Sequence, residues 1–232
     1  MIADVRPPRV IRELSLLKLP MRIRICFPSK EDDYCDWVSV LDSYKRYVFS
    51  SAKVLEIGAS EPRRTRELSR WCQELIGIEL FPDRTPPDFG NVHYVTGDWQ
   101  ELSTIVQLES IDLAVSTHVI EHVPNDLQAI NELYRVLKPG GCAILNTPNR
   151  KRLVREIVES FAGERKFPYW EHQREYVEDD LKQLLDRSRF PKYSIIPVAF
   201  GVHGGPLFIY STSVPVWLRR MANFWEIHLF KE

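Results

Sequence analysis

Cysteine is scarce in this sequence, and no two cysteines have the spacing of a metal or redox site. The four cysteines of the 232-residue chain are Cys26, Cys35, Cys72 and Cys142, and no two of them are separated by two residues. Zinc knuckles and thioredoxin-like centres both need such pairs, so neither class of site is expected. Isolated cysteines usually act as small buried apolar side chains.

Long uninterrupted apolar runs are also absent. The segment 193–218 contains no Asp, Glu, Lys or Arg and is long enough for a membrane span. Prolines and glycines break it and would leave backbone groups without partners in lipid. We therefore expect two strands and a loop there. The apolar stretch Leu14–Leu19 is too short and too interrupted for a signal peptide, so we expect a cytoplasmic protein with no membrane partner.

A dominant charge of one sign is missing as well. Lys and Arg together number 31 and Asp and Glu together 32, which gives a formal net charge of −1. A neutral chain of this kind is not built mainly to neutralise nucleic-acid phosphates, so a nucleic-acid partner is not favoured. We interpret two basic clusters as solvated helix faces and not as an RNA surface. They are Arg63, Arg64 and Arg66, and Lys151, Arg152 and Arg155.

Short β-like runs alternate with amphipathic stretches between Lys53 and Pro148, which is typical of βαβ units and a mostly parallel sheet. Seven strands are predicted, at residues 53–58, 75–80, 91–96, 111–117, 142–147, 193–200 and 226–230. Helices are predicted at 60–74, 125–138 and 177–188, and Pro139-Gly140-Gly141 is expected to end the second. The fold class is therefore α/β.

The chain is expected to have two parts. Residues 1–50 form an N-terminal extension, in which Asp32–Tyr47 has the apolar spacing of a helix and could form a lid. Residues 51–232 form the main domain, with substrate-side insertions near 150–175 and 201–224. These variable segments are rich in Trp, Tyr, Phe and His, and aromatic walls suit a small organic or sugar acceptor.

Polar residues gather where the predicted parallel strands end, which is where open parallel sheets bind ligands. The candidate binding residues at the first four strand ends are Glu56, Gly58, Ala59, Ser60, Glu79, Leu80, Asp98, Trp99, Ser116 and His118. Each also has a simpler interpretation when it is taken alone. Glu79 would be a solvated residue after a strand, Asp98 would cap the following helix, and Trp99 would pack in the core.

Five segments carry a family resemblance when they are taken in order: VLEIGAS, IEL, GDW, STHVIEHV and ELYRVLKPGG. Together they resemble the class I S-adenosylmethionine (SAM)-dependent methyltransferases of the methyltransferase-11 and -23 types. The resemblance implies a Rossmann-like, seven-stranded, mostly parallel sheet with helices on both faces and an antiparallel seventh strand. It also implies SAM as the cofactor. The chain departs from the family pattern at Ser60 and Pro62, which stand where two glycines are usual.

The adenosine part of SAM suits the acidic strand ends. Glu79 could accept hydrogen bonds from both ribose hydroxyls, and Asp98 could accept one from the adenine amino group, with Trp99 packed near the ring. The sequence has no G-x-G-x-x-G to hold a pyrophosphate, and SAM has none. A nicotinamide or flavin dehydrogenase is therefore disfavoured.

The methionine part of SAM is expected at the ends of the first and fourth strands. Gly58 lets the backbone approach it, and Glu56 would orient that region. Ser116 and His118 would border the methionine end. The implied activity is methyl transfer to a small-molecule acceptor, at an oxygen of a sugar or another metabolite.

Removal of a proton from a hydroxyl acceptor needs a base, and we predict that His172, in the segment WEHQRE, takes this role. The alternative for His172 is a hydrogen-bonded loop histidine. Glu121 and His122 resemble a metal pair, but adjacent residues on a helix point apart, so no metal is expected.

Two other functions stay open from the sequence. A non-catalytic SAM-binding or partner subunit is suggested by Ser60 and Pro62 in place of glycines. An RNA methyltransferase is the less favoured alternative.

Overall fold

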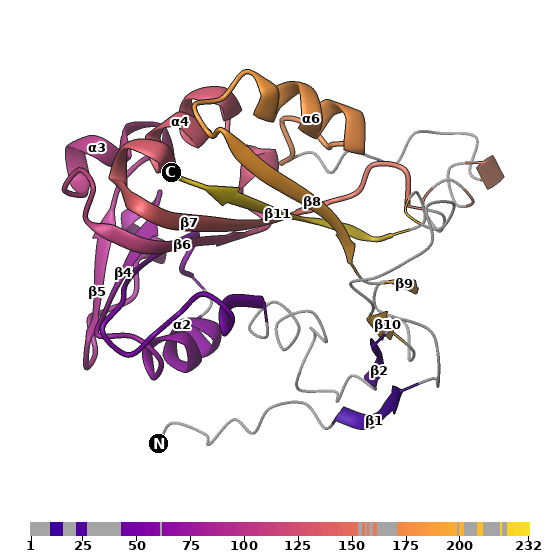
Figure 1. Ribbon diagram of the computed structural model, residues 1–232, viewed down its shortest axis with the longest axis horizontal. Coiled ribbons are helices and arrows are strands. Elements are labelled where there is room, and N and C mark those ends of the chain that lie inside the picture. The colour runs from indigo at the N-terminus through magenta and orange to yellow at the C-terminus, as the bar shows by residue number, and fades with distance from the viewer. Residues whose placement is uncertain are drawn as a thin grey trace.

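Figure 1 shows the computed structural model, which describes residues 10–15, 22–26, 43–60, 62–152, 155, 157, 160–161, 171–198, 200–201, 208–210, 219 and 222–232. Within these residues the chain forms a seven-stranded sheet and a four-stranded sheet. The larger sheet has the strand order β5-β4-β3-β6-β7-β11-β8.

The larger sheet confirms the predicted fold class. Its strands are β3 (Lys53–Ile57), β4 (Glu74–Glu79), β5 (Val92–Thr96), β6 (Ile111–Thr117), β7 (Leu137–Pro148), β8 (Lys192–Val198) and β11 (Phe224–Phe230). The first five pair in parallel, and β11 pairs antiparallel with both β7 and β8. All seven predicted strands are therefore present, and the last one runs antiparallel as expected.

Helices cover both faces of this sheet (Figure 1). The helix α2 (Pro62–Ser69) lies on one face, and α3 (Leu102–Ile105), α4 (Asp126–Val136) and α6 (Glu178–Asp186) lie on the other. Three short 3-10 turns follow strand ends or precede helices: η1 (Pro82–Arg84), η2 (Trp99–Glu101) and η3 (Ile120–His122).

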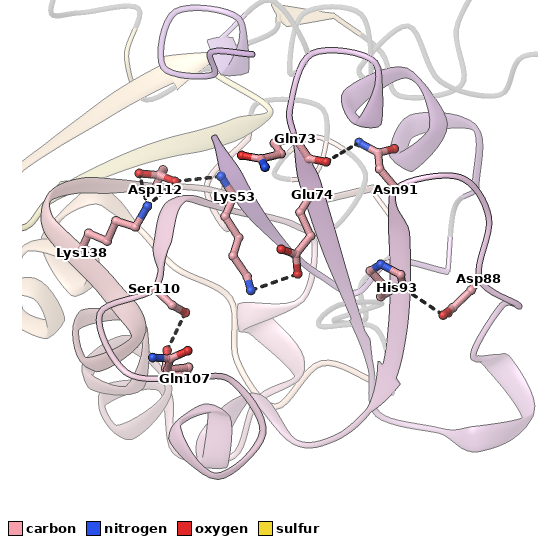
Figure 2. Close-up of polar contacts among 10 residues, drawn as sticks. All are labelled: Lys53, Gln73, Glu74, Asp88, Asn91, His93, Gln107, Ser110, Asp112 and Lys138. Carbon is pink, nitrogen blue, oxygen red and sulfur yellow. Dashed lines mark hydrogen bonds and ion pairs between the residues drawn. The ribbon is translucent and has the colours of Figure 1, made fainter. Parts of the chain in front are cut away.

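The helix predicted over 60–74 is shorter in the structure, because α2 ends at Ser69. The Asn91 side-chain amide donates to the carbonyls of Ser69 and Cys72, both at 3.0 Å. It also donates to the Gln73 carbonyl at 3.2 Å (Figure 2). Glu74 then enters β4 beside Lys53 of β3. The long-range hydrogen bonds of the Asn91 side chain and the strand pairing outweigh the apolar spacing that favoured a longer helix.

The second predicted helix also ends earlier than expected. The helix α4 stops at Val136, and β7 begins at Leu137, so Pro139-Gly140-Gly141 lies inside the strand and not after the helix. The pairing of β6 and β7 shifts register between Ile111 and Leu113, and Gly140 has a φ of +80°. This irregularity allows β7 to begin at the residue that follows the end of α4.

The core lies in two layers, one on each face of the sheet. The layer beneath α4 and α6 includes Leu133, Leu181 and Trp225, and the layer beneath α2 includes Leu68 and Val115. Cys72 and Cys142 are buried and free in the second layer, as predicted for isolated cysteines. Burial raises the pKa of the Cys72 thiol to about 11 and that of Cys142 to about 12, so both stay protonated near neutral pH.

A smaller antiparallel sheet joins distant parts of the chain. It has the order β1-β2-β10-β9, with β1 (Val10–Ser15), β2 (Arg22–Cys26), β9 (Phe200–Gly201) and β10 (Phe208–Tyr210). The predicted N-terminal extension therefore contains two strands, and one of them pairs with the segment predicted as the second insertion. Most of the predicted lid helix, residues 32–42, lies outside the described residues.

None of the helices in the described part of the chain is long and apolar enough to cross a membrane. The cytoplasmic location stays a prediction.

The amino-terminal edge of the large sheet is fixed by charged side chains (Figure 2). Asp112 accepts a hydrogen bond from the Lys53 backbone N–H at 2.8 Å and ion-pairs with Lys138 at 2.8 Å. Lys53 also reaches Glu74 at 3.0 Å. These contacts tie β3, β4, β6 and β7 together at the edge opposite the predicted cofactor residues.

We expect Asp112→Ala to lower the free energy of unfolding by about 1–3 kcal/mol, because the Lys53 N–H loses its acceptor in a partly buried place. Urea denaturation followed by circular dichroism measures the change. Glu74→Ala is the matched control, since it removes only a solvated ion pair worth at most about 1 kcal/mol. Equal losses in the two variants would contradict the assignment to Asp112.

Candidate active site

Parallel pairing places the ends of β5, β4, β3 and β6 side by side. The Gly97 N–H donates to the Glu79 carbonyl at 2.8 Å, so Glu79 and Asp98 lie at adjacent strand ends. β3 pairs with β6 as far as Ser116, which puts Glu56 in the neighbouring strand. The predicted cofactor residues of the first four strands therefore meet at one edge of the sheet.

A buried ion pair fixes the loop that leaves β3. Glu56 has none of its surface exposed, and Arg64 of α2 donates to its Oε1 at 2.7 Å. Arg64 also donates to the Gly58 carbonyl at 3.3 Å. The interpretation of Arg64 as part of a solvated helix face is therefore wrong, because its guanidinium compensates a carboxylate inside the sheet. Among the described residues, none donates a hydrogen bond to the second, buried oxygen of Glu56.

The loop after β3 needs a residue without a side chain at Gly58. Gly58 has a φ of +74°, and a Cβ there would lie 2.3 Å from a methyl carbon of Val119. The N–H groups of Gly58 and Ala59 both donate to the Ile78 carbonyl, at 2.9 and 3.3 Å. The loop is thus held against β4 and against the segment that follows β6.

Glu79 ends β4 as a nearly buried carboxylate, with 7% of its surface exposed. Burial raises its pKa, and this is only partly offset by hydrogen bonds from the Ser60 backbone and hydroxyl and by the charge of Arg84. Ser60, the residue that replaces a family glycine, therefore donates to the predicted ribose ligand. The other oxygen, Glu79 Oε1, is buried and accepts no hydrogen bond from the part of the chain that the structure describes. The next residue, Leu80, is 53% exposed at this edge.

Asp98 and Trp99 follow β5 and have clear structural roles. Asp98 caps η2, accepting from the Gln100 N–H at 2.8 Å, and the Gln100 side chain also donates to both of its oxygens. This confirms the capping interpretation of Asp98. Trp99 is buried among the core residues beneath α4, which confirms its packing interpretation. Their contacts with adenine stay predictions.

The end of β6 carries Ser116 and His118. Ser116 is buried, and its hydroxyl has no hydrogen-bond partner. His118 adopts a φ of +56°, a conformation that non-glycine residues rarely take and that is typical of functional loops. Between them, Thr117 lies 3.0 Å from the hydroxyl of buried Tyr44, so the segment before β3 packs on this strand end.

A cluster of histidine and glutamate side chains lies beyond β6. His172 Nδ1 is 2.9 Å from Glu175 Oε1, and the His172 and His122 rings meet edge to face with centroids 4.7 Å apart. Glu121 is fully buried and accepts from the Thr147 hydroxyl at 3.0 Å. One potential ligand atom from each of Glu121, His122 and His172 lies within 4.8 Å of the other two.

The structure contradicts the expectation that Glu121 and His122 point apart. They lie in the short 3-10 turn η3, whose geometry differs from that of an α-helix. The N–H groups of Gln173 and Arg174 donate to the Glu121 carbonyl at 2.9 and 3.2 Å, which brings His172 to the same place.

Comparison with known proteins agrees with this geometry. A family model described as a methyltransferase domain, of the methyltransferase-23 type, matches residues 30–191, which is more than half of the chain. The chain belongs to the class I SAM-dependent methyltransferases. The resemblance identified from the five sequence segments is thereby confirmed, and SAM is the cofactor that the family implies.

Two curated relatives match the central part of the chain. A probable S-adenosylmethionine-dependent methyltransferase of Mycolicibacterium smegmatis is 32% identical over 107 residues, covering 42% of this chain and 38% of its own. A malonyl-[acyl-carrier protein] O-methyltransferase of a Marinomonas species is 32% identical over 106 residues, covering 46% of this chain and 36% of its own. The chain thus spans well under half the length of these relatives.

Solved structures share the fold at low identity. A SAM-dependent methyltransferase of Thermotoga maritima is 20% identical with a TM-score of 0.62, covering 84% of this chain and 89% of its own. One from Archaeoglobus fulgidus is 18% identical with a TM-score of 0.59, covering 83% and 92%.

The residues at the sheet edge fit SAM chemically. The buried oxygen Glu79 Oε1 lacks a hydrogen-bond donor, and a ribose hydroxyl would supply one. Gly58 keeps the loop after β3 free of a side chain where Val119 approaches it. Sequence reasoning missed Arg64 and Val119, which shape this loop. Their roles depend on contacts across the fold, and no local pattern indicates them.

Proposed function

We propose that the protein transfers a methyl group from SAM to an oxygen of a small-molecule acceptor. Bound SAM would supply an activated methyl group, since the sulfonium can release a neutral thioether in an in-line displacement. The protein's own residues would then provide alignment and a site for the acceptor. The observation that carries the proposal is the nearly buried Glu79 carboxylate, with one oxygen lacking a donor, at the family's strand edge.

The cofactor would be held along neighbouring strand ends. Glu79 would accept the ribose hydroxyls through the oxygen that Ser60 does not occupy, and Asp98 would accept from adenine while it still caps η2. Exposed Leu80 would contact the adenosine face. The loop of Gly58, Ala59 and Ser60, fixed by Glu56, would hold the methionine part.

The acceptor would lie beyond β6, where His118 adjoins the cluster of Glu121, His122 and His172. Ser116 precedes it at the end of β6. Two features support an oxygen acceptor. Imidazole and carboxylate groups are suited to removing a proton from a hydroxyl. The Marinomonas relative is also named as an O-methyltransferase. Burial lowers the pKa of His172, against the opposing charge of Glu121, so the ring is neutral near pH 7.

A small molecule is favoured over RNA because three of the six residues in the two basic clusters are buried. Arg64, Arg152 and Arg155 are all buried, at 8%, 8% and 2% exposure, so the prediction that these arginines are solvated is wrong. Arg155 forms an ion pair with Glu175. These three positive charges are therefore not available to meet phosphates.

A partner subunit without catalytic activity is the second candidate. The observation that favours it is the hydrogen bonding of Ser60 to Glu79, which occupies part of the predicted ribose ligand. Calorimetric titration with SAM and with S-adenosylhomocysteine tests cofactor binding. Turnover of an acceptor panel of sugars, hydroxy acids and phenols then distinguishes an enzyme from a binding protein. Absence of SAM binding would contradict the proposed function.

We expect Glu79→Gln to weaken SAM binding by about 1.5–3 kcal/mol, roughly 10- to 150-fold, because a hydrogen bond to a charged group is lost. Isothermal titration calorimetry measures the affinity. Glu74→Gln is the matched control, since it makes the same change at the opposite end of β4. Unchanged affinity in Glu79→Gln would remove this residue from the site.

The affinity for SAM should also depend on pH through Glu79. The carboxylate is the form that accepts both hydroxyls, so affinity is full above its pKa and falls as the pH drops through that value. Because burial raises the pKa, the fall should begin at a higher pH than for an ordinary glutamate near about 4.3. Calorimetry across a pH series tests this, and Glu79→Gln should flatten the profile.

A further inference from the structure

We propose that Glu121, His122 and His172 bind a divalent transition-metal ion of the zinc class at the acceptor side of the site. The proposal reverses the expectation from the sequence that this chain holds no metal. It rests on three observations: the convergence of the three side chains, the hydrogen bonds that orient both imidazoles, and a buried carboxylate oxygen without a donor.

The three side chains converge although they come from separate segments. Glu121 and His122 belong to η3, and His172 comes from the segment before α6, some fifty residues later along the chain. Their potential ligand atoms lie within 4.8 Å of one another. Ligands bonded to one ion at about 2.0–2.2 Å are separated by roughly 3–4 Å, so small side-chain movements would complete the site.

Both imidazoles are held by oxygen acceptors at Nδ1. His122 Nδ1 lies 3.0 Å from the Glu171 carbonyl, and His172 Nδ1 lies 2.9 Å from Glu175 Oε1. A carbonyl and a carboxylate can only accept, so each Nδ1 carries the hydrogen and each Nε2 carries the lone pair. Metal-binding histidines almost always show this arrangement, in which an outer oxygen fixes the tautomer and the ring orientation.

The carboxylate of Glu121 is oriented in the same way. Its Oε2 accepts from the Thr147 hydroxyl at 3.0 Å. Its Oε1 is buried, lies 3.5 Å from His118 Nδ1 and accepts no hydrogen bond from the described residues. A buried carboxylate oxygen beside two imidazole lone pairs favours a cation.

The ligand set indicates the class of ion. Two imidazole nitrogens and one carboxylate oxygen suit Zn²⁺, Co²⁺, Ni²⁺ or Fe²⁺, whereas Ca²⁺ and Mg²⁺ prefer oxygen ligands. Three protein ligands leave a position for a further group. Given the proposed function, that group is the acceptor hydroxyl, whose pKa the ion would lower. The lone pair of His172 would then bind the ion, which replaces the general-base role predicted from the sequence.

Metal binding can be measured without turnover. Protein stripped with a chelator is titrated with Co²⁺, followed by its visible absorption, and with Zn²⁺ by calorimetry. We expect one ion per chain. Glu175→Gln, which alters the outer partner of His172, should weaken Co²⁺ binding by about 10- to 100-fold. His122→Gln and His172→Gln should weaken it further, because each removes a ligand.

The matched control is His93→Gln. His93 is an exposed histidine of β5 that pairs with Asp88 (Figure 2), so this change should leave the metal affinity unchanged. Urea denaturation verifies that each variant is folded, and the metal titration of the parent protein decides the proposal if a variant is not. Absence of stoichiometric Co²⁺ and Zn²⁺ binding would overturn the proposal, as would equal affinities in the parent protein, His122→Gln and His172→Gln.

The experiment also separates this inference from the proposed function. SAM affinity is measured on the metal-free protein, so loss of SAM binding with intact metal binding contradicts only the proposed function. With an acceptor in hand, the two roles of His172 also give opposite results. A chelator should abolish turnover if His172 is a metal ligand and leave it unchanged if His172 is the base.

Discussion

Replacing Arg64 with methionine is expected to lower the free energy of unfolding by about 3–5 kcal/mol, because it leaves the Glu56 carboxylate buried without its partner. Glu56 is fully buried and receives the Arg64 guanidinium at 2.7 Å. The same guanidinium donates to the Gly58 carbonyl. The loop of Gly58, Ala59 and Ser60 should therefore also lose its position. Urea denaturation measures the stability, and calorimetry with SAM measures the effect on the site.

The nearby ion pair of Arg70 and Glu67 provides the control. It has similar geometry, at 2.6 Å, but the Arg70 side chain is 66% exposed. Arg70→Met should therefore change the stability by no more than about 0.5 kcal/mol. The double variant Glu56→Gln with Arg64→Met should recover part of the loss, because no charge is then left buried. A small effect of Arg64→Met alone would contradict the role given to this buried ion pair.

The second large effect is expected at Gly58. Gly58→Ala places a side chain at a φ of +74°, which costs about 1–2 kcal/mol, and brings its Cβ against Val119. Overpacking of this kind adds about 1–3 kcal/mol. The variant should therefore be destabilised by both causes and should bind SAM weakly.

Two further variants separate the two causes at Gly58. Gly140→Ala makes the same change at a φ of +80°, where a new Cβ would have no atom within 4 Å, so it reports the backbone cost alone. Adding Val119→Ala to Gly58→Ala should relieve the clash and leave only that cost. If Gly58→Ala were no worse than Gly140→Ala, close packing of the two loops would not explain the glycine.

Most of the fold could be predicted because the strands of the large sheet have recognisable local sequence patterns. Buried strands such as β3 and β6 are short apolar runs that end in small or polar residues, and period and length identify them. Helix ends were less predictable. The end of α2 depends on the Asn91 side chain, and the start of β7 depends on pairing with β6, so both are set by residues distant in sequence.

The candidate site was predictable where it depends on strand order. Glu79 and Asp98 follow adjacent parallel strands, so their meeting at one edge follows from the topology. The cluster at the acceptor side was not predictable in the same way. The α-helical geometry assumed for Glu121 and His122 was wrong, because η3 is a single 3-10 turn stabilised by the segment that carries His172.

The sequence by itself determined the strand pattern, the family and the row of acidic residues proposed to bind the cofactor, because each depends on neighbours along the chain or on strand order. Only the tertiary structure decided that Arg64 is buried against Glu56, that Ser60 binds Glu79, and that His172 joins Glu121 and His122. These contacts bring together segments that are distant in the sequence. The free energies of packing and of buried ion pairs depend on distances in space, which no local sequence pattern indicates.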